Sequence, residues 1–417
     1  MEMGLSEGLI FRDRKVLAEQ YIPPELRVRK REATFLVRKL LSRFSEGRAG
    51  DVVAIFGSPG RSGIGKTTLT KYVGYKLEEL ARQRGIRFKF IYTNVYSAPS
   101  LYEILTVIAG QLSPRINLKG SSTLEALKAI VDYLYEKSYY VLIAIDEFQN
   151  LVNSPKVDDA YLYSLIRIYE QVPPPDGIPR ISYLLVASDY LVFSKLRSKM
   201  PQIESQITFR QHLEPYRVDE LYEILEQRAQ LAFYDNAWNP KILEIIANYY
   251  GVDGTGIKDG NARRAINALN TAAEYAEFEG SNVIMEEHVR KALSVDSMAN
   301  VSAQDLEGLS IHELLVLLAV AQYTMRSSEP LTTGRLRQFY KEIAEYYGET
   351  PRGHSQFNQY INNLASIGLL NVTPSGKGMR GRTSIIQLPV EIPATALYEV
   401  VEEIIKRKTG IGVRNWI

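Results

Sequence analysis

The feature that most constrains this chain of 417 residues is a glycine-rich loop between an apolar run and a helix-like run. The apolar run Val52–Phe56 breaks into GSPGRSGIGKTT, which contains the spacing G-x-x-x-x-G-K-[ST] at Gly60, Gly65, Lys66 and Thr67. Glycines let successive backbone N–H groups of such a loop point at a phosphate, and the following helix presents its positive N-terminal end to the same anion. The spacing predicts the phosphate-binding loop of a nucleotide-binding protein.

The side chains of this loop have separate expected tasks. Lys66 places a positive charge beside the β- and γ-phosphates, and the Thr67 hydroxyl ligates Mg²⁺. We therefore expect ATP or ADP, together with Mg²⁺, as the cofactor. The residues expected to contact the nucleotide at this loop are Gly60, Arg61, Ser62, Gly63, Ile64, Gly65, Lys66, Thr67 and Thr68.

Strand-like apolar runs alternate with helical periodicity over the first half of the chain. The strand-like runs are Val52–Phe56, Arg87–Thr93, Tyr139–Ile145 and Ile181–Ala187, and the helical segments are Ser100–Gln111, Thr123–Lys137 and Asp158–Glu170. This alternation is typical of a parallel sheet covered by helices on both faces. We predict an α/β phosphate-loop fold for this part.

A second motif, the acidic pair Asp146-Glu147, ends the apolar run Tyr139–Ile145. In parallel sheets, a carboxylate at the C-terminal end of a strand faces ligands bound in the crevice there. We expect Asp146 to hold Mg²⁺, directly or through water, and Glu147 to polarise the water that attacks the γ-phosphorus.

The composition excludes several other kinds of site. The chain contains no cysteine, which rules out disulfides, thiolate metal sites and cysteine nucleophiles, and its four histidines lie far apart in sequence. The net charge of +2 does not by itself indicate a nucleic-acid binder, so any such signal is local. Because no long apolar span or signal peptide is present, we expect a cytoplasmic protein with no membrane association.

The chain becomes all-helical after Tyr216, and its last part has the pattern of three helices and a β-hairpin. That pattern predicts a winged helix, a variant of the helix-turn-helix. Between Thr350 and Val390 the sequence has four Lys or Arg residues and no Asp or Glu, so this face is electropositive. The residues expected to contact DNA are the amides of the third helix, Gln356, Gln359, Asn362 and Asn363, and the basic residues Arg352, Lys377, Arg380 and Arg382.

Together these motifs resemble an AAA+ ATPase of the initiator clade, and more narrowly the archaeal origin-recognition and cell-division-cycle proteins. The likeness covers nearly the whole chain. It is carried by GSPGRSGIGKTT and LIAIDEFQ as Walker A and Walker B, by LEPYRVDELYEIL before the lid, and by GNARRAIN as sensor 2. The resemblance implies an AAA+ base with a parallel five-stranded sheet, an all-helical lid and a C-terminal winged helix.

Further site residues follow from this resemblance. The lead-in FRDRKVLAEQYIPPELRVRKRE is similar to the family's adenine-lining box, which implies contacts to the base from Tyr21, Ile22, Pro23 and Arg29. Arg263 falls at the nucleotide-sensing arginine of sensor 2. Asp189 falls at sensor 1, where the family usually has Asn. The resemblance thus implies that Asp146, Glu147, Asp189 and Arg263 act around the γ-phosphate.

Two features of the family are harder to place on this chain. The arginine finger, which acts on the nucleotide of a neighbouring subunit, is either Arg197 or Arg210. The family's DNA-touching insertion helix falls within Tyr96–Gly120, with Arg115 and Lys119 as its basic residues. The ambiguous finger, Asp189 at sensor 1 and a phosphate loop that is longer before Gly60 than the usual form indicate a divergent, second-type paralogue.

The function implied by the resemblance is that of an ATP-dependent replication-origin-binding initiator with weak ATPase activity. Its implied partners are double-stranded origin DNA, the replicative MCM helicase and paralogous initiator subunits, which places it with the nucleoid. The expected domains are a base at 1–215, a lid at 216–298 and a winged helix at 305–417. Two alternatives remain open: a transcriptional or signalling ATPase with a winged-helix effector, and a remodelling enzyme whose winged helix docks protein.

Overall fold

The computed structural model describes residues 10–96, 100–155, 157–298, 306–327, 329–367, 369–374, 384–388 and 394–409. The chain divides into two compact units. One unit holds Arg12–Phe233 together with Asp259–Ile266, and the other holds Met1–Phe11, Tyr234–Lys258 and Asn267–Ile417. The first unit thus contains the phosphate loop, Walker B and the sensor 2 arginines.

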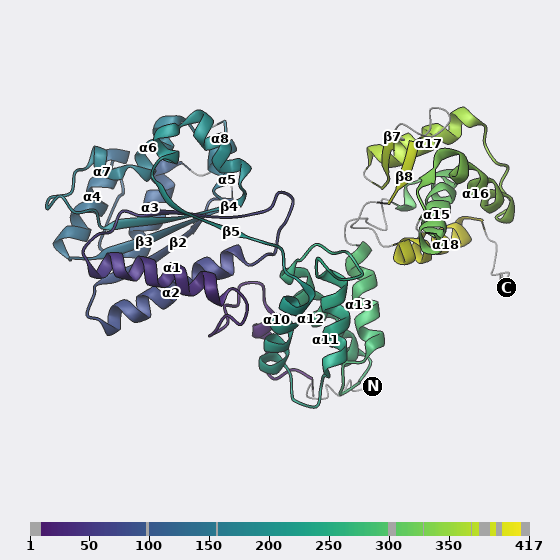
Figure 1. Cartoon of the computed structure of the whole chain (residues 1–417), viewed down its shortest axis with the longest axis horizontal. Coiled ribbons are helices and arrows are strands. Elements are labelled where there is room, and N and C mark those ends of the chain that lie inside the picture. Colours follow the sequence, from purple (N-terminus) through teal and green to yellow (C-terminus); the bar gives the residue numbers. More distant parts are fainter. Residues whose placement is uncertain are drawn as a thin grey trace. The chain divides into compact units, whose positions relative to one another are not determined.

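The first unit is built on a five-stranded parallel sheet (Figure 1). Its strands are β1 (Val52–Gly57), β2 (Phe88–Asn94), β3 (Tyr140–Asp146), β4 (Ile181–Asp189) and β5 (Ile207–Leu213). They lie in the order β2-β3-β4-β1-β5, so β1 lies between β4 and β5 and its C-terminal end lies beside the end of β4. This arrangement confirms the predicted sheet.

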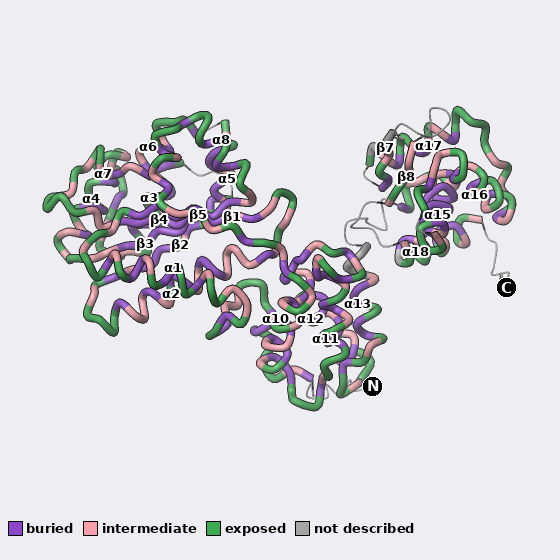
Figure 2. Tube along the Cα trace, in the orientation of Figure 1, coloured by how far each residue is buried: buried purple, intermediate pink, exposed green. Residues whose placement is uncertain are grey.

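The inner strands β1, β3 and β4 are almost entirely buried (Figure 2), because helices cover each side of the sheet, whereas exposed residues alternate with less exposed ones along the edge strand β5. Successive side chains alternate between the faces: Val53 and Ile55 pack with α1 and α2, whereas Val52 and Ala54 face the opposite layer. The helices on the first face are α1 (Lys30–Ser45) and α2 (Lys66–Gln83). Those on the second are α3 (Leu101–Leu112), α4 (Thr123–Glu136), α5 (Gln149–Asn153), α6 (Asp159–Ile166), α7 (Ile168–Gln171), α8 (Leu191–Lys199) and α9 (Pro201–Glu204).

The segment between β2 and β3 contains two well-capped helices. At the start of each, a serine side chain accepts the N–H of a glutamate three residues on, while that glutamate accepts the serine N–H: Ser100 with Glu103 for α3, and Ser122 with Glu125 for α4. The single helix predicted at Asp158–Glu170 is wrong, since the backbone of Arg167 leaves helical geometry (φ −107°, ψ 44°) and separates α6 from α7.

The lead-in segment of the first unit lies against α10 (Val218–Ala232). It contains the short helix η1 (Arg14–Leu17), and the N–H groups of Arg12 and Asp13 both donate to the carbonyl of Ala232. These backbone bonds join two segments more than 200 residues apart in sequence.

The second unit contains the remaining helices of the lid and the C-terminal winged helix. The lid helices are α11 (Pro240–Tyr250), α12 (Ala262–Phe278), whose first turn belongs to the first unit, and α13 (Glu286–Met298). The C-terminal elements are α15 (Ile311–Arg326), β6 (Leu331–Thr332), α16 (Thr333–Tyr346), α17 (His354–Ser366), β7 (Asn371–Pro374), β8 (Ser384–Gln387) and α18 (Ala394–Thr409). The strands pair antiparallel in the order β6-β8-β7, which confirms the predicted winged helix.

The core of the winged helix is formed around α15, whose residues Leu314–Ala321 are all buried. The C-terminal helix α18 packs against α15 through Leu397, Val401, Ile404 and Ile405, an addition that the sequence reading did not anticipate. The expected wing residues Lys377, Arg380 and Arg382 lie outside the described residues. Across the part of the chain that is described, no helix has both the length and the apolar character needed to span a membrane.

Candidate functional site

The phosphate loop joins the C-terminal end of β1 to α2, which begins at Lys66. Gly60, Gly63 and Gly65 have φ values of 72°, 64° and 85°. In this left-handed region side chains other than glycine are strained, so the loop's curl depends on these glycines. The arrangement turns the loop and the first turn of α2 towards a common point, as phosphate binding requires.

Lys66 lies half-buried at the start of α2, among the other charged residues of the site. The pKa of Lys66 lies below its ordinary value, mainly because the side chain is partly buried. The carboxylates of Glu147, Asp146 and Asp189 raise this pKa, and the charge of Arg263 lowers it further. The structure therefore brings together the charged groups expected from Walker A, Walker B and both sensors. Lys66 therefore has both acidic neighbours and a cation, Arg263, close enough to act on its charge.

Asp146 lies buried at the end of β3 and receives three hydrogen bonds. Its Oδ2 accepts from the hydroxyls of Thr67 (2.7 Å) and Tyr92 (2.8 Å), and its Oδ1 accepts from the N–H of Glu147 (2.9 Å). A carboxylate facing a threonine hydroxyl is the all-oxygen donor set that Mg²⁺ prefers, so these residues fit a magnesium ion held with the nucleotide phosphates. Burial and Asp146 raise the pKa of Tyr92, which keeps its hydroxyl a donor.

Glu147 adopts a left-handed backbone conformation, with φ at 59°. Such strain in a residue other than glycine recurs at functional sites, where it aims a side chain. The Gln149 amide donates to the Glu147 carboxylate and accepts the N–H of Ser188 (3.0 Å), and the Ser188 hydroxyl donates to Asp189 (2.8 Å). A continuous hydrogen-bond path therefore joins Walker B to the sensor 1 position.

The two arginines at the start of α12 point to different partners. Arg264 donates to Asp259 at 2.9 Å, whereas Arg263 is more than half exposed and pairs with Glu19 of the lead-in at 2.9 Å. Arg263 also acts on the pKa of Lys66. This effect links Arg263, at the sensor 2 position, to the charge of the phosphate-loop lysine.

The predicted adenine-lining residues fall into two groups. Tyr21 lies under the Arg228 guanidinium, at 4.6 Å, and its carbonyl accepts a hydrogen bond from it (3.1 Å); Ile22 and Pro23 follow directly. Arg29 forms the second group: its guanidinium stacks on the Tyr216 ring at 4.5 Å and donates to the Glu214 carbonyl.

Arg228 is a residue that sequence reasoning missed. It is buried on α10 and donates to the carbonyls of Val16 and Tyr21, so it fixes the lead-in segment against α10. Burial lowers the pKa of Arg228 to about 10, so the side chain remains charged at neutral pH. Tyr92, Gln149, Tyr216 and Asn261 were missed as well, since no local pattern marks them.

Both arginines considered for the finger bind the same acid. Arg197 is 70% exposed and Arg210 40% exposed, and each donates to Glu204 of α9. Ion pairs at such exposed positions contribute little to stability, so either guanidinium is released at little cost. The geometry does not separate the two.

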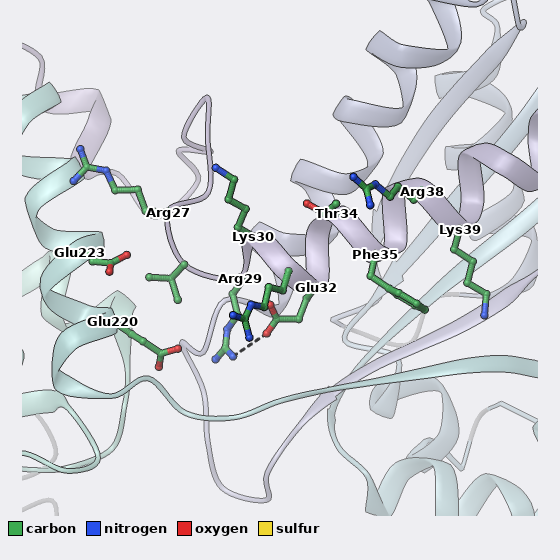
Figure 3. A pocket seen from close by; sticks show the side chains of 12 residues that line it. Arg27, Arg29, Lys30, Glu32, Thr34, Phe35, Arg38, Lys39, Glu220 and Glu223 are labelled. Carbon is green, nitrogen blue, oxygen red and sulfur yellow. Dashed lines mark hydrogen bonds and ion pairs between the residues drawn. The ribbon is translucent and has the colours of Figure 1, made fainter.

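A groove of about 1200 Å³ lies between α1 and α10 (Figure 3). Its cations are largely paired: Arg27 donates to Glu226 and Gln230, and Lys30 donates to Glu25. The α10 wall adds carboxylates, so the groove presents both signs of charge. None of the phosphate-loop residues lines it, which separates it from the nucleotide site.

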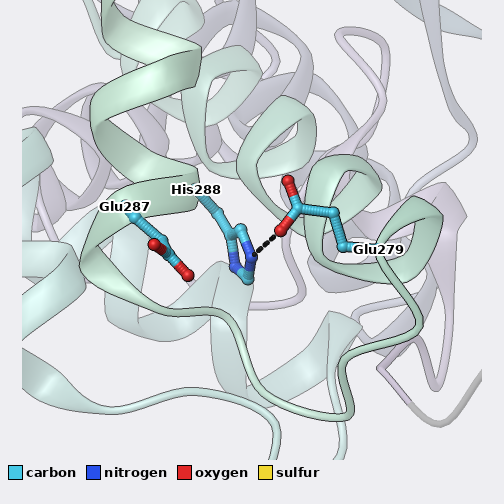
Figure 4. A group of neighbouring side chains, drawn as sticks. All are labelled: Glu279, Glu287 and His288. Atoms are coloured by element: carbon cyan, nitrogen blue, oxygen red, sulfur yellow. Dashed lines mark hydrogen bonds and ion pairs between the residues drawn. The ribbon is translucent and has the colours of Figure 1, made fainter.

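Glu279, Glu287 and His288 come close enough together to suggest a metal site (Figure 4). His288 is fully buried, and its Nδ1 accepts the N–H of Met285 (3.0 Å), so Nε2 carries the proton and donates to Glu279 (3.1 Å). The other Glu279 oxygen accepts from Lys291. Because both ring nitrogens are engaged, we interpret the cluster as a structural link between the end of α12 and α13.

In the winged helix, the structure separates the two faces of α17 as the amide pattern predicts. Phe357, Ile361 and Leu364 are buried, whereas Gln356, Gln359, Asn362 and Asn363 are exposed. The Asn363 amide donates to Glu313 of α15 at 3.2 Å. The exposed amides of α17 other than Asn363 are therefore those of Gln356, Gln359 and Asn362.

Arg352 is exposed but is tied to the core beneath it. Its Nε donates to Nε2 of the buried His312 (2.8 Å), and its N–H donates to the Tyr340 hydroxyl (3.1 Å). Tyr340 also bonds to Nδ1 of His312 (2.9 Å), so a neutral imidazole with its proton on Nδ1 satisfies the whole set. Burial and Arg352 lower the pKa of His312, while Glu349, 3.8 Å away, partly opposes them.

This arrangement predicts that acid destabilises the winged helix. Because the folded pKa of His312 lies below the unfolded value of 6.5, the unfolded state binds the extra proton first, and stability falls as the pH decreases through about 6.5. The slope for one group is at most about 1.4 kcal/mol per pH unit. Thermal unfolding of the full chain at pH 7.5 and 5.5 should show a smaller pH effect for His312→Gln than for wild type. The exposed-site control His354→Gln should behave as wild type, and equal pH effects in all three proteins would contradict the assignment.

Comparison with known proteins gives the same three parts. Residues 55–182 match the model of an AAA domain, residues 222–294 that of a Cdc6 AAA+ ATPase-type lid domain, and residues 304–395 that of the CDC6 C-terminal winged helix domain.

Relatives with similar sequences extend along the whole chain. The chain is 46% identical over 410 residues to the ORC1-type DNA replication protein 2 of Aeropyrum pernix, covering 98% of this chain and 99% of the relative. It is 32% identical over 412 residues to the protein of the same name from Saccharolobus solfataricus, covering 96% of each. A solved structure of the Aeropyrum pernix ORC2 protein, in ADPNP–ADP complexes, is 44% identical with a TM-score of 0.71, covering 96% of this chain and all of that one.

The matches account for the motifs and for their order along the chain. The AAA domain carries the phosphate loop and Walker B described above, and the similar solved structure holds ADPNP and ADP, so this is a nucleotide-binding AAA+ ATPase domain. The second-type numbering of the relatives agrees with the divergent paralogue predicted from sequence. The chain belongs to the archaeal ORC1-type DNA replication proteins, a Cdc6-related family of AAA+ ATPases with a C-terminal winged helix.

Proposed function

We propose that this protein is an ATP-dependent initiator that binds double-stranded origin DNA and helps load the replicative MCM helicase. The observation that supports the proposal most is that one chain carries both kinds of site. Lys66 of the phosphate loop has Asp146, Glu147, Asp189 and Arg263 among its charged neighbours, and the third helix of the winged helix presents three exposed amides. Relatives named as DNA replication proteins match over nearly their whole length.

In the proposed ATP site each group acts by position and charge, as in phosphoryl transfer generally. Lys66 and the loop N–H groups bind the phosphates, and Thr67 and Asp146 hold Mg²⁺, which neutralises charge on the β- and γ-phosphates. Glu147 orients the attacking water. Asp189 and Arg263 report the γ-phosphate to the rest of the chain.

We infer that the monomer alone is a weak ATPase and acts as a nucleotide switch. The finger arginine of this chain, Arg197 or Arg210, pairs with Glu204 in the monomer and would act on the nucleotide of a neighbouring initiator subunit, which in turn would supply the arginine for this site. An arginine that completes the site in trans is worth about 10³–10⁵ in rate in other phosphate-loop enzymes.

The DNA contacts of the proposal lie on α17 and the wing, with α3 and the exposed Arg115 and Lys119 after it as the second contact. We assign three working parts to the chain: a base at 1–215, a lid at 216–298 and a winged helix at 305–417. Binding to chromosomal DNA would place the protein with the nucleoid in the cytoplasm.

The function is tested by selecting and sequencing genomic DNA fragments bound by the full chain at near-physiological salt, with ATP and with ADP. Enrichment of fragments around a replication start is the expected result. Enrichment of scattered promoters would instead support a transcriptional regulator. Recovery of random DNA only would overturn origin binding and leave protein docking as the role of the winged helix.

The recognition helix gives a more specific prediction. Replacing both Gln359 and Asn362 with Ala should reduce affinity for the selected sequence towards that for random DNA, because a good amide–base contact discriminates by about 1–3 kcal/mol. Binding to both DNAs is measured by fluorescence anisotropy as a function of salt. Gln202→Ala, an exposed glutamine of the base, is the matched control. Unchanged discrimination in the double variant would remove α17 from base readout.

A further inference from the structure

Two glycines of the phosphate loop lie directly against side chains from the segments that border the lid. A methyl group added to Gly63 would overlap the Asn261 amide, and one added to Gly65 would overlap the Tyr216 hydroxyl. Both contacts lie within the first compact unit. Two residues that lie 150 to 200 positions later in sequence therefore pack against the phosphate loop at Gly63 and Gly65.

Tyr216 is held rigidly at this position. It is 5% exposed, its ring stacks against the Arg29 guanidinium at 4.5 Å, and its N–H donates to the Gly260 carbonyl at 3.2 Å. Arg29 is itself fixed, since it donates to the Glu214 carbonyl and pairs with Glu32. The hydroxyl against Gly65 is thus the end of a side chain that cannot easily move aside.

Asn261 uses both ends of its amide. The carbonyl oxygen caps α12 by accepting the N–H of Arg264 (3.1 Å), and the amide nitrogen donates to the Ser62 hydroxyl (3.3 Å). The next residue, Ala262, donates its N–H to the Gly63 carbonyl at 3.0 Å. Asn261 is 6% exposed, so water does not replace these bonds readily.

We propose that Tyr216 and Asn261 are positioning residues that hold the phosphate loop in its phosphate-binding form and join it to the first turn of α12. This inference rests on the proposed nucleotide site and adds how that site is kept assembled. Asn261 and Ala262 bond to the loop, and Arg263 is the next residue of the chain. A shift of the phosphate loop would therefore also shift the sensing arginine. Asn261 bonds to Ser62 and Arg264, whereas Tyr21, on the expected adenine side of the site, contacts Arg228, so the contacts of Asn261 with the loop concern the phosphates.

The inference predicts a loss specific to phosphates. Asn261→Ser keeps a good helix cap, because serine and asparagine are equally favoured there, but is too short to fill the space at Gly63 and bond to Ser62. The affinity for ADP should fall at least tenfold, while that for adenosine should stay within twofold. Both affinities are measured by calorimetric titration of the full chain.

The matched control is Asn239→Ser, the same change at the N-cap of α11, where Asn239 accepts the N–H groups of Lys241 and Ile242. It should leave both affinities unchanged. Equal losses of ADP and adenosine binding in Asn261→Ser would indicate a general defect and overturn the proposal, as would an unchanged affinity for ADP.

Tyr216 supplies an independent test. Tyr216→Phe keeps the ring on Arg29 and removes only the hydroxyl against Gly65, so ADP affinity should fall about threefold. Tyr216→Leu also loses the stacked ring and should bind ADP at least tenfold more weakly. Thermal unfolding without nucleotide checks that each variant is folded. If both variants bind ADP as tightly as wild type does, Tyr216 does not position the loop.

The wild-type titration in the same series separates the two levels of inference. Absence of ADP binding to the wild-type chain would overturn the proposed nucleotide site itself. Wild-type binding with undiminished binding of ADP by Asn261→Ser and Tyr216→Leu would overturn only the positioning role.

Discussion

Lys66→Ala should weaken the binding of ATP and ADP by at least 100-fold. Lys66 lies at the positive start of α2, surrounded by the charged groups of both Walker motifs and both sensors. Alanine removes the positive charge that opposes the phosphates and leaves Asp146, Glu147 and Asp189 to repel them. A charge-assisted contact in such a half-buried site is worth more than an ordinary hydrogen bond.

The measurement is a titration of the full chain with fluorescently labelled ADP and ATP. Lys76→Ala is the matched control, since Lys76 is a lysine of the same helix whose partner is Glu79 at the surface. The control should bind as wild type does. If Lys66→Ala retained wild-type affinity, the phosphates would not bind at this loop.

Glu147→Gln should keep ATP affinity and lower the rate of hydrolysis by at least 100-fold. The amide has nearly the same shape as the carboxylate but cannot accept a proton from the attacking water. The substitution leaves the left-handed backbone at position 147 unchanged in shape. The hydrogen bond from Gln149 is also kept, because the side-chain oxygen of glutamine can accept it.

Hydrolysis is followed as phosphate release at saturating ATP, and binding by titration. Glu136→Gln, an exposed change at the end of α4 just before β3, serves as the control and should hydrolyse ATP normally. Wild-type turnover in Glu147→Gln would assign the base elsewhere, with Asp189 as the nearest acid in the same hydrogen-bond path.

Local patterns predicted the elements that are encoded locally. The apolar runs of β1, β3 and β4 fold as central strands because the strands are buried on both faces, and the glycine spacing of the phosphate loop reflects φ values that other residues avoid. The exposed amides of α17 follow from helical periodicity in the same way. The break between α6 and α7 was missed, because buried apolar residues continue on both sides of Arg167 and no proline or glycine marks the position.

Contacts between side chains that are far apart in sequence were not predicted. Tyr92 reaches Asp146 only because β2 and β3 pair in register, with Asn94 opposite Asp146. The contact of Arg29 with the adenine stays a prediction, whereas its stacking on Tyr216, a residue 187 positions later (216 − 29) in sequence, was not predicted. Nothing in the local sequence of either residue specifies that contact.

The sequence by itself determined the class of the fold, the nucleotide chemistry and the order of the parts, because short-range spacing encodes phosphate loops, buried strands and amphipathic helices. The tertiary structure alone decided which side chains support that chemistry. Asn261 meets Ser62 across 199 positions, and Arg228 meets Val16 across 212, and such contacts exist only once the sheet, α10 and the first turn of α12 have packed together. Packing of this kind depends on the whole fold, so no single stretch of the chain contains it.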